Sequence, residues 1–382
     1  MNVRLALLTE IISPYRIPVF NALARHEGID LHVIFLAETD ATQRQWLVYK
    51  DEIRFSYEVL PAWRWRWHSW HILLNRGMRR ALSRFGPNSV LCGGYNHPAF
   101  WEALAWAKFH SAHFAVWIES TSQDQRNSST LTRLVKRLFV RKCSAFAVPG
   151  KASFEYVRSM GIPAERIHTA PNAVDNHRFA ALASSVRGRD PQYRAELGLP
   201  QRYLLYAGRI IPEKGVFQLL EAYTRLAPEM RSQVGLVFVG DGSAKRELRE
   251  RAARVHPGTV IFPGFAQRDQ LATFYALAEV LVFPTLSDPW GLVVNEAMAC
   301  GQPIIATDVA GCTADLVQDE QNGYVIPAGN VQRLAEAMAA FARDPKLASG
   351  MGACSARLIE SFSPESCAAG LAAAGVPTSP ST

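Results

Sequence analysis

The fold is decided by the stretch SDPWGLVVNEAMACGQPIIAT, which occupies residues 287–307. The run Glu279–Phe283, apolar from Val280 onward, precedes it and predicts a strand, and the apolar run near the end of the stretch predicts a second one. Between them a helix begins after Gly291 and stops at Gly301, and Pro303 prevents its continuation. This order is typical of a parallel α/β sheet. Such a helix starts at the carboxyl end of a strand, where open α/β sheets bind ligands.

The start of this helix is a candidate anion site. The backbone N–H groups of Gly291, Leu292 and Val293 are expected to point at a ligand, and a helix N-terminus favours negative charge. Asp288 and Glu296 flank these donors. Carboxylates do not hold an anion, so they suit a ligand that carries hydroxyls as well as phosphate, such as a nucleotide sugar. The alternative is a buried turn with two capping carboxylates.

This segment resembles the donor-site signature of the retaining glycosyltransferases of family 4, which have the GT-B fold. That signature has two glutamates with seven residues between them, an Ala-Met-Ala-Cys-Gly-like run and a proline. Glu296 stands at the second glutamate, and Asp288 replaces the first. The resemblance implies that Asp288 contacts hydroxyls of the donor sugar and that Glu296 contacts the ribose.

A second motif follows the predicted strand at 203–207. It begins with Gly208 and Arg209 and ends with Lys214 and a glycine, and it resembles the family's Gly-Arg-x4-Lys-Gly element. Arginine offers a rigid fork of donors and lysine a point charge, so together they can neutralise a diphosphate. The motif is not a Walker A loop, because no Ser or Thr follows the lysine. The alternative is a solvated surface turn.

Two glycine-containing loops follow the next predicted strands. The first holds Gly240 and Gly242, and the second holds Gly264 and Phe265. Both resemble family loops that border the nucleotide base. The first is not a dinucleotide-binding fingerprint, since the third glycine of that pattern is absent.

Polar residues also follow strands predicted in the first half of the chain. Arg16 lies in the loop after the first strand, and the resemblance implies a place for it at the interdomain cleft. Asn96 and His97 follow a Gly-Gly pair and could hydrogen-bond an acceptor. Glu119 could orient the acceptor hydroxyl or stabilise positive charge on the sugar. The alternatives are helix starts for Arg16 and Glu119 and a structural turn for His97.

Short apolar strands that alternate with helices predict parallel sheets covered on both faces. The second half has strands at 203–207, 234–239, 259–262, 280–283, 303–306 and 324–326. The resemblance implies an α/β protein of the GT-B fold, with two Rossmann-like parallel-sheet domains that face a cleft. We expect an acceptor-side domain at 1–171, joined by a C-terminal helix at about 361–382. A nucleotide-sugar donor domain is expected at 172–360.

Composition and charge favour a protein that binds anionic small molecules or anionic lipid. The 382 residues carry a net charge of +7, which suits anionic small molecules or anionic lipid, and we find no nucleic-acid motif. The six cysteines form no CxxC pair, and no apolar stretch approaches the length of a membrane span. These features predict a cytoplasmic protein, with the inner membrane face as a second location. No Asp-x-Asp occurs, so we expect no metal and no cofactor besides the donor substrate.

Aromatic and basic residues alternate in one short segment. Trp63, Trp65 and Trp67 alternate with Arg64 and Arg66. If this segment is extended, the tryptophans share one face and the arginines the other. Such a surface suits an anionic membrane, since indole rings favour the interface and arginines favour the head groups. The alternative is that the tryptophans fill a core or line an acceptor cleft.

The resemblance to family 4 implies a retaining glycosyltransferase, and the missing Asp-x-Asp with the cationic motif predicts that it uses no metal. It would move a sugar from a nucleoside diphosphate to an acceptor hydroxyl in the synthesis of a polysaccharide, glycolipid or other glycoconjugate. No side chain is an evident covalent nucleophile, so the resemblance implies a same-face displacement assisted by the leaving phosphate. A nucleotide-sugar epimerase of the same fold and a noncatalytic sugar-nucleotide-binding protein are the alternatives.

Overall fold

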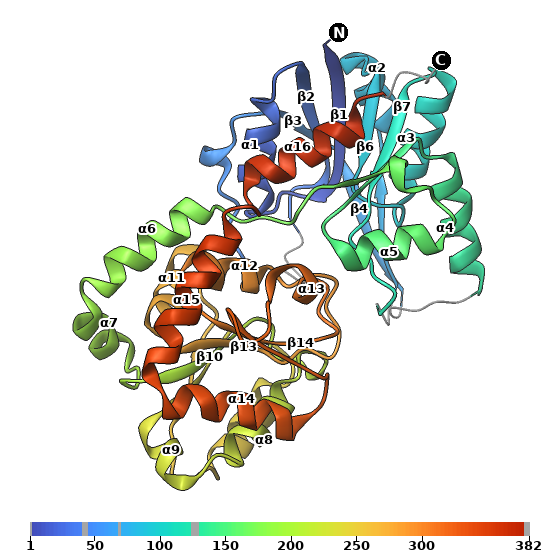
Figure 1. Ribbon diagram of the computed structural model, residues 1–382. Coiled ribbons are helices and arrows are strands. Elements are labelled where there is room, and N and C mark those ends of the chain that lie inside the picture. Colours follow the sequence, from blue (N-terminus) through green and yellow to red (C-terminus); the bar gives the residue numbers. More distant parts are fainter. Residues whose placement is uncertain (1, 40–44, 68–69, 124–129, 378–382) are drawn as a thin grey trace. The chain divides into compact units, whose positions relative to one another are not determined.

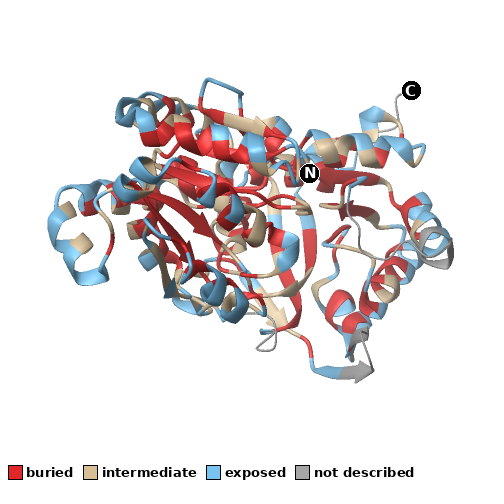
Figure 2. Cartoon of the chain, turned by 90° about the horizontal axis from the view of Figure 1, so that it is seen from below, coloured by how far each residue is buried: buried red, intermediate tan, exposed pale blue. Residues whose placement is uncertain are grey.

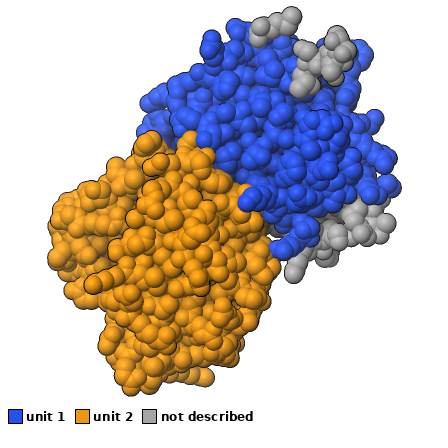
Figure 3. All heavy atoms as spheres, viewed as in Figure 1, with its two compact units in different colours: residues 1–174, 364–382 blue, residues 175–363 orange. Residues whose placement is uncertain are grey.

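The computed structural model describes residues 2–39, 45–67, 70–123 and 130–377 (Figure 1). The chain forms two compact units (Figure 3). Unit 1 comprises Met1–Val174 and Pro364–Thr382, and unit 2 comprises Asp175–Ser363. The divisions after 171 and 360 expected from the sequence lie three residues earlier in each case.

Unit 1 is built on a seven-stranded parallel sheet with the order β3-β2-β1-β6-β7-β8-β9. Its strands are β1 (Val3–Ile11), β2 (Ile29–Ala37), β3 (Ser56–Val59), β6 (Ser89–Cys92), β7 (His113–Trp117), β8 (Ala145–Val148) and β9 (Ile167–Thr169). The strands are apolar along most of their length and buried on both faces, as parallel sheets require (Figure 2). This architecture confirms the predicted fold class for the first half.

Helices cover both faces of this sheet. Those of unit 1 are α1 (Arg16–Ala24), α2 (Met78–Phe85), α3 (Pro98–Phe109), α4 (Thr130–Lys142), α5 (Lys151–Ser159) and α16 (Pro364–Gly375). Side chains alternate along β1, so Leu5 and Leu7 pack with α1 and α16, whereas Ala6 and Leu8 pack with α2 to α5. The C-terminal segment therefore completes one of the two cores of unit 1. Gly370 permits this contact, because a Cβ there would lie 2.1 Å from the Thr169 carbonyl oxygen.

A separate two-stranded antiparallel sheet joins β4 (Ala62–Trp67) to β5 (Trp70–Asn75). Residues 63–67 are therefore extended, which is the condition under which the tryptophans would share one face. Trp63 is 71% exposed, so it does not fill the core, and the Arg76 guanidinium lies 5.3 Å from the centre of its ring. The side chains at 65–72 lie outside the described residues, and with them the other tryptophans of this prediction.

Unit 2 contains a six-stranded parallel sheet with the order β12-β11-β10-β13-β14-β15. Its strands are β10 (Tyr203–Ala207), β11 (Gly235–Val239), β12 (Val260–Gly264), β13 (Val280–Phe283), β14 (Ile304–Thr307) and β15 (Gly323–Ile326). All six predicted strands are confirmed within two residues. The strand order reverses between β10 and β13, which is where a doubly wound sheet opens a crevice at its carboxyl edge.

The helices of unit 2 cover both faces of this sheet. They are α6 (Asn176–Arg187), α7 (Asp190–Leu197), α8 (Val216–Thr224), α9 (Pro228–Gln233), α10 (Lys245–Ala252), α11 (Arg268–Leu277), α12 (Leu292–Ala299), α13 (Thr313–Leu316), α14 (Val331–Arg343) and α15 (Pro345–Ile359). A 3-10 turn, η3 (Pro212–Lys214), precedes α8.

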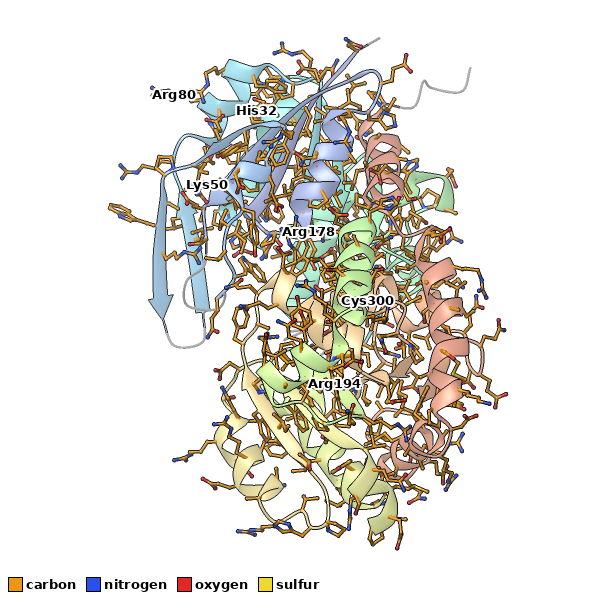
Figure 4. The ribbon with its side chains drawn as sticks, turned by 90° about the vertical axis from the view of Figure 1, so that its left-hand side faces the viewer. His32, Lys50, Arg80, Arg178, Arg194 and Cys300 are labelled. Carbon is orange, nitrogen blue, oxygen red and sulfur yellow. The ribbon has the colours of Figure 1, made fainter. Side chains whose placement is uncertain are left out.

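Arginines of α6 and α7 hold the carboxyl ends of α11 and α12. Arg187 donates to the Ala276 carbonyl at 3.1 Å and to the Cys300 carbonyl at 2.6 Å, and Arg194 donates to the Leu277 carbonyl at 2.9 Å. Figure 4 labels Arg194 and Cys300 on this side of unit 2. Helix ends leave carbonyls without partners, and cations are favoured there. These contacts fix α12, which carries Glu296, and α11, which carries Tyr275, a residue hydrogen-bonded to Glu296.

All six cysteines are free thiols, and five of them are buried. Desolvation is the largest cause of the raised pKa values of the five buried thiols: it raises the pKa of Cys143 to about 12 and that of Cys367 to about 12. The sixth, Cys354, lies half-buried on α15. Buried thiols with raised pKa values stay protonated at neutral pH and are poor nucleophiles.

Candidate functional site

The glycines predicted to border a nucleotide meet at the carboxyl edge of the unit 2 sheet. The Gly208 amide donates to the carbonyl of Val239, which ends β11, and the Gly240 amide donates to the Gly264 carbonyl at 2.8 Å. Gly208, Gly240, Gly242 and Gly264 all have positive φ. A Cβ at Gly240 would lie only 1.9 Å from the Gly208 carbonyl oxygen. The three loops after β10, β11 and β12 therefore form one surface of closely packed backbone.

Replacing Gly240 by alanine is expected to destabilise unit 2 by about 2–3 kcal/mol, because φ is +140° and the new Cβ meets a backbone oxygen. Gly350→Ala is the matched control. It lies inside α15, and a Cβ added there would meet no atom within 4 Å, so the change should leave stability equal or higher. Urea unfolding of both variants measures the difference. Equal midpoints would show that the close approach at Gly240 carries no strain.

Phe265 follows Gly264 at the end of β12. Its side chain is 43% exposed, unlike the many phenylalanines buried in the two cores. An exposed aromatic ring beside a glycine-rich loop offers a flat apolar surface on which a planar ligand can stack.

Lys214 and Asp288 form an ion pair in the structure. The Lys214 Nζ lies 2.5 Å from Asp288 Oδ2 and donates to the Ser287 carbonyl at 2.9 Å. The other carboxylate oxygen of Asp288 accepts from the Trp290 amide at 3.1 Å. Only 10% of the Lys214 side chain and 16% of the Asp288 side chain are exposed. The structure therefore joins the two motifs that the sequence places 74 residues apart.

Arg209 is exposed, and its side chain forms no ion pair with the described residues. Its backbone is held in place, since the Tyr206 hydroxyl donates to the Arg209 carbonyl at 2.6 Å. Burial, with a smaller contribution from the charge of Asp288, raises the pKa of Tyr206 far above its usual value. Tyr206 thus stays a neutral donor, and Arg209 is an exposed cation after β10 that a ligand can reach.

The first turn of α12 points its backbone amides at the same edge of the sheet. Gly291 precedes the helix with φ +103°, and a Cβ there would lie 2.5 Å from the Phe283 ring. Among the described residues, no side chain caps this helix start. The amides of Leu292 and Val293 belong to the helix start, where N–H groups lack intrahelical partners.

Glu296 lies on the second turn of α12 with no exposed surface. Its Oε2 accepts a hydrogen bond of 2.7 Å from the hydroxyl of Tyr275, a buried residue of α11. The sequence interpretation did not identify Tyr275. One chemical argument could have indicated Tyr275: a buried tyrosine in an apolar helix needs a hydrogen-bond partner for its hydroxyl.

A second polar cluster lies at the carboxyl edge of the unit 1 sheet. Arg16 forms an ion pair with Glu119, donates to Asn172 Oδ1 at 2.9 Å, and stacks 3.9 Å from the centre of the Trp117 ring. The Arg16 side chain is 17% exposed, whereas 41% of the Glu119 side chain faces solvent. Arg16 is thus a fixed support, and Glu119 is the group that a ligand can reach. The sequence interpretation missed Trp117 and Asn172.

Asn96 and His97 lie in the loop after β6, next to β1. His97 Nε2 lies 3.4 Å from Glu10 Oε2 and 3.2 Å from Asn96 Nδ2, and its ring packs edge-on against Phe100. His97 is buried, whereas Glu10 is partly exposed. Glu10 lies near the carboxyl end of β1, and Asn96 and His97 follow β6, so they stand on either side of the point where the strand order of unit 1 reverses.

Neither a metal-binding cluster nor a membrane-spanning helix is present in the described part of the chain. No group of three or more His, Cys, Asp or Glu side chains there could hold a metal ion. Among the helices of the described ranges, none combines the length and the apolar composition that crossing a bilayer needs.

Comparison with protein families gives two matches. The family described as "Glycosyl transferases group 1" matches residues 190–356, and "Glycosyltransferase Family 4" matches residues 19–178. The first range lies inside unit 2, and the second lies almost wholly in unit 1.

Among individual proteins, the chain is similar to an alpha-D-kanosaminyltransferase of Streptomyces kanamyceticus, with 31% identity over 59% of this chain and 58% of that protein. It is also 38% identical to a D-inositol 3-phosphate glycosyltransferase of Streptomyces scabiei, over 47% of this chain and 42% of that protein. The matches thus span about half the length of these curated relatives.

Two solved structures share the fold over nearly the whole chain. Anabaena Alr3699/HepE in complex with UDP and glucose gives a TM-score of 0.74 at 18% identity, covering 97% of this chain and 98% of that one. Sucrose-phosphate synthase from Thermosynechococcus elongatus gives 0.72 at 20% identity, covering 96% of each chain.

Proposed function

The chain belongs to the glycosyltransferases of the group 1 and family 4 type, with the GT-B fold, and we propose that it transfers a sugar from a nucleoside diphosphate to an acceptor hydroxyl. One observation carries the proposal. In unit 2, the backbone loops around Gly240, the Lys214–Asp288 pair and the open start of α12 converge on the strand-order reversal beside β10. That edge offers amides and cations for phosphate and a carboxylate for sugar hydroxyls.

The donor would lie along this edge in an order set by chemistry. The diphosphate suits Arg209, Lys214 and the amides at the start of α12, because these are the positive groups. The sugar hydroxyls suit Asp288, and the base suits the exposed ring of Phe265. Glu296 is buried, so a contact with the ribose requires its side chain to become accessible.

The Lys214–Asp288 pair gives this site a way to respond to its ligand. Without a ligand, each group neutralises the other across 2.5 Å. A bound diphosphate competes for Lys214, and a sugar hydroxyl can then donate to the carboxylate that the lysine releases. Arg209, which is exposed, would supply the first attraction to the phosphates.

We propose that transfer retains the configuration of the sugar. The bond between the anomeric carbon and the diphosphate oxygen breaks, and the acceptor oxygen bonds to the same face. The acceptor proton passes to the departing phosphate oxygen, and the cations around Lys214 and Arg209 stabilise the charge that remains there.

The acceptor is proposed to bind unit 1 at Glu119, with Arg16 holding the carboxylate in place. A carboxylate that faces solvent can orient a hydroxyl for attack. The acceptor class would be a glycan, a lipid-linked sugar or a small polyol. An anionic membrane contact through the hairpin that exposes Trp63 remains a prediction.

A donor panel tests the proposed function. The protein is mixed with uridine, guanosine and adenosine diphosphate sugars, and the rise in Tm identifies a donor. Uridine compounds come first, since Alr3699/HepE was crystallised with UDP-glucose. Free diphosphate should then appear only after an acceptor is added, and NMR of the product should show the donor's anomeric configuration. Diphosphate release without acceptor, or interconversion of the sugar alone, would favour an epimerase.

Removal of divalent metal is expected to leave activity within about twofold, because cationic side chains and a helix start occupy the place where a metal would act. Turnover is measured after treatment with EDTA and after Mg²⁺ or Mn²⁺ is restored. Loss of activity on chelation followed by recovery with metal would contradict the proposed metal independence.

A further inference from the structure

Helix α4 lies at the periphery of unit 1 (Figure 1), and it exposes an apolar strip. Leu134, Val135 and Leu138 are 56%, 40% and 47% exposed. The opposite side of the same helix supplies Phe139 and Val140 to the core, both fully covered. A surface helix normally presents one apolar side, which faces the core. A helix with a second apolar side toward solvent indicates an interaction surface.

Basic residues lie along one side of this strip and within it. At 100° per residue, Arg137 and Arg141 lie on one side of Leu134 and Leu138, and Lys142 lies among the apolar positions. All three basic side chains are exposed, and none forms an ion pair with the described residues. The helix sequence contains no aspartate or glutamate. The surface is therefore an apolar strip with two arginines along one side and a lysine within it.

The remaining basic residue of the described part of α4 faces the other way. Lys136 Nζ lies 4.2 Å from the ring centre of Tyr156 and 4.7 Å from that of Tyr95, and it donates to the Tyr156 hydroxyl. Tyr95 belongs to the loop that carries Asn96. Lys136 thus fixes α4 to the body of unit 1, so the exposed strip is a rigid surface.

We propose that α4 docks unit 1 on an anionic lipid bilayer. The leucines enter the interface between acyl chains and head groups, and the arginines and Lys142 contact lipid phosphates. The charge complementarity selects this partner, because an apolar protein partner alone would leave three desolvated cations without counter-charge. The proposal stands independently of sugar transfer, and it concerns a surface separate from the hairpin.

Co-sedimentation with vesicles tests the docking. Wild-type protein is expected to bind vesicles of phosphatidylcholine with 30% phosphatidylglycerol and to bind pure phosphatidylcholine vesicles weakly or not at all. The combined variant Arg137→Gln, Arg141→Gln and Lys142→Gln should bind the anionic vesicles roughly 100-fold more weakly, at about fivefold for each charge. Added salt should weaken the wild type in the same direction.

Two further variants separate charge from apolar insertion. Leu134→Gln with Leu138→Gln should reduce binding at least tenfold while all charges remain, because the inserting surface is gone. The matched controls are Leu197→Gln on α7 for the leucines and the triple change Arg246→Gln, Arg254→Gln and Arg343→Gln for the charges. Both controls alter exposed residues of unit 2 and should bind like the wild type. Circular dichroism confirms that each variant is folded.

Several results would overturn the proposal. Equal binding of the wild type to neutral and anionic vesicles, or none to either, would remove the lipid partner. Binding that survives both α4 variants but is lost in Trp63→Ser would move the contact to the hairpin. If light scattering shows self-association that the α4 variants abolish, and vesicle binding is absent, the strip is a protein interface instead.

Discussion

Arg209→Ala is expected to lower kcat/KM for the donor roughly 100-fold, at a cost of about 2–4 kcal/mol in transition-state stabilisation. The side chain is exposed and pairs with none of the described residues, so its removal should leave the fold unchanged. Lys214→Met should have an effect of the same size on the same parameter. Initial rates of diphosphate release at varied donor concentration measure both.

The two cations need different controls. Lys214→Met leaves the carboxylate of Asp288 without its cation. The Asp288 side chain is only 16% exposed, so this variant should also lose stability. The double change Lys214→Met with Asp288→Asn should restore the melting temperature but not the activity. Arg225→Ala removes an exposed arginine that directly follows α8 and pairs with Glu221, and this variant should be active. Turnover near wild type in Arg209→Ala and in the double change would remove both motifs from the mechanism.

Glu296→Gln is expected to weaken binding of the free nucleoside diphosphate and of the intact donor to the same extent, by roughly tenfold or more. The reason is that both ligands carry the ribose. Asp288→Ala should weaken binding of the intact donor far more than binding of the free diphosphate, since Asp288 is proposed to contact the sugar. Isothermal titration calorimetry with each ligand separates the two roles.

Tyr275→Phe provides the control for Glu296. It keeps the carboxylate and removes the 2.7 Å hydrogen bond to Oε2, so the expected loss is about 1 kcal/mol in stability, with a smaller change in affinity. Should Glu296→Gln lower the melting temperature and leave the affinity for diphosphate intact, Glu296 would be a structural partner of Tyr275. Equal weakening of the free diphosphate by Asp288→Ala and Glu296→Gln would contradict the division of roles.

The sequence predicted those parts of the fold that depend on local signals. Apolar runs located the six strands of unit 2, and Gly291 and Gly301 marked both ends of α12. The turns at the glycines near residues 208 and 240 could also be predicted, because a turn that approaches another backbone closely excludes any Cβ.

Contacts between residues far apart in the sequence could not be predicted from local signals. The Lys214–Asp288 pair and the Arg16–Glu119 pair join loops that follow different strands, and only the strand order of the sheet brings them together. Tyr275 carries no motif at all. Its role follows from the burial of Glu296, which is a property of the packed helices.

The buried cysteines allow local opening of the chain to be compared between the wild type and these variants. Because five of the six cysteines are buried, a maleimide dye should label the native protein once, at Cys354 on α15. Labelling of the other five then requires unfolding or local opening, so its rate reports how often the chain opens. Counting labelled thiols by mass spectrometry would rank Gly240→Ala and Lys214→Met against the wild type at ambient temperature, and a bound donor should slow the labelling of Cys300 and Cys312 in unit 2.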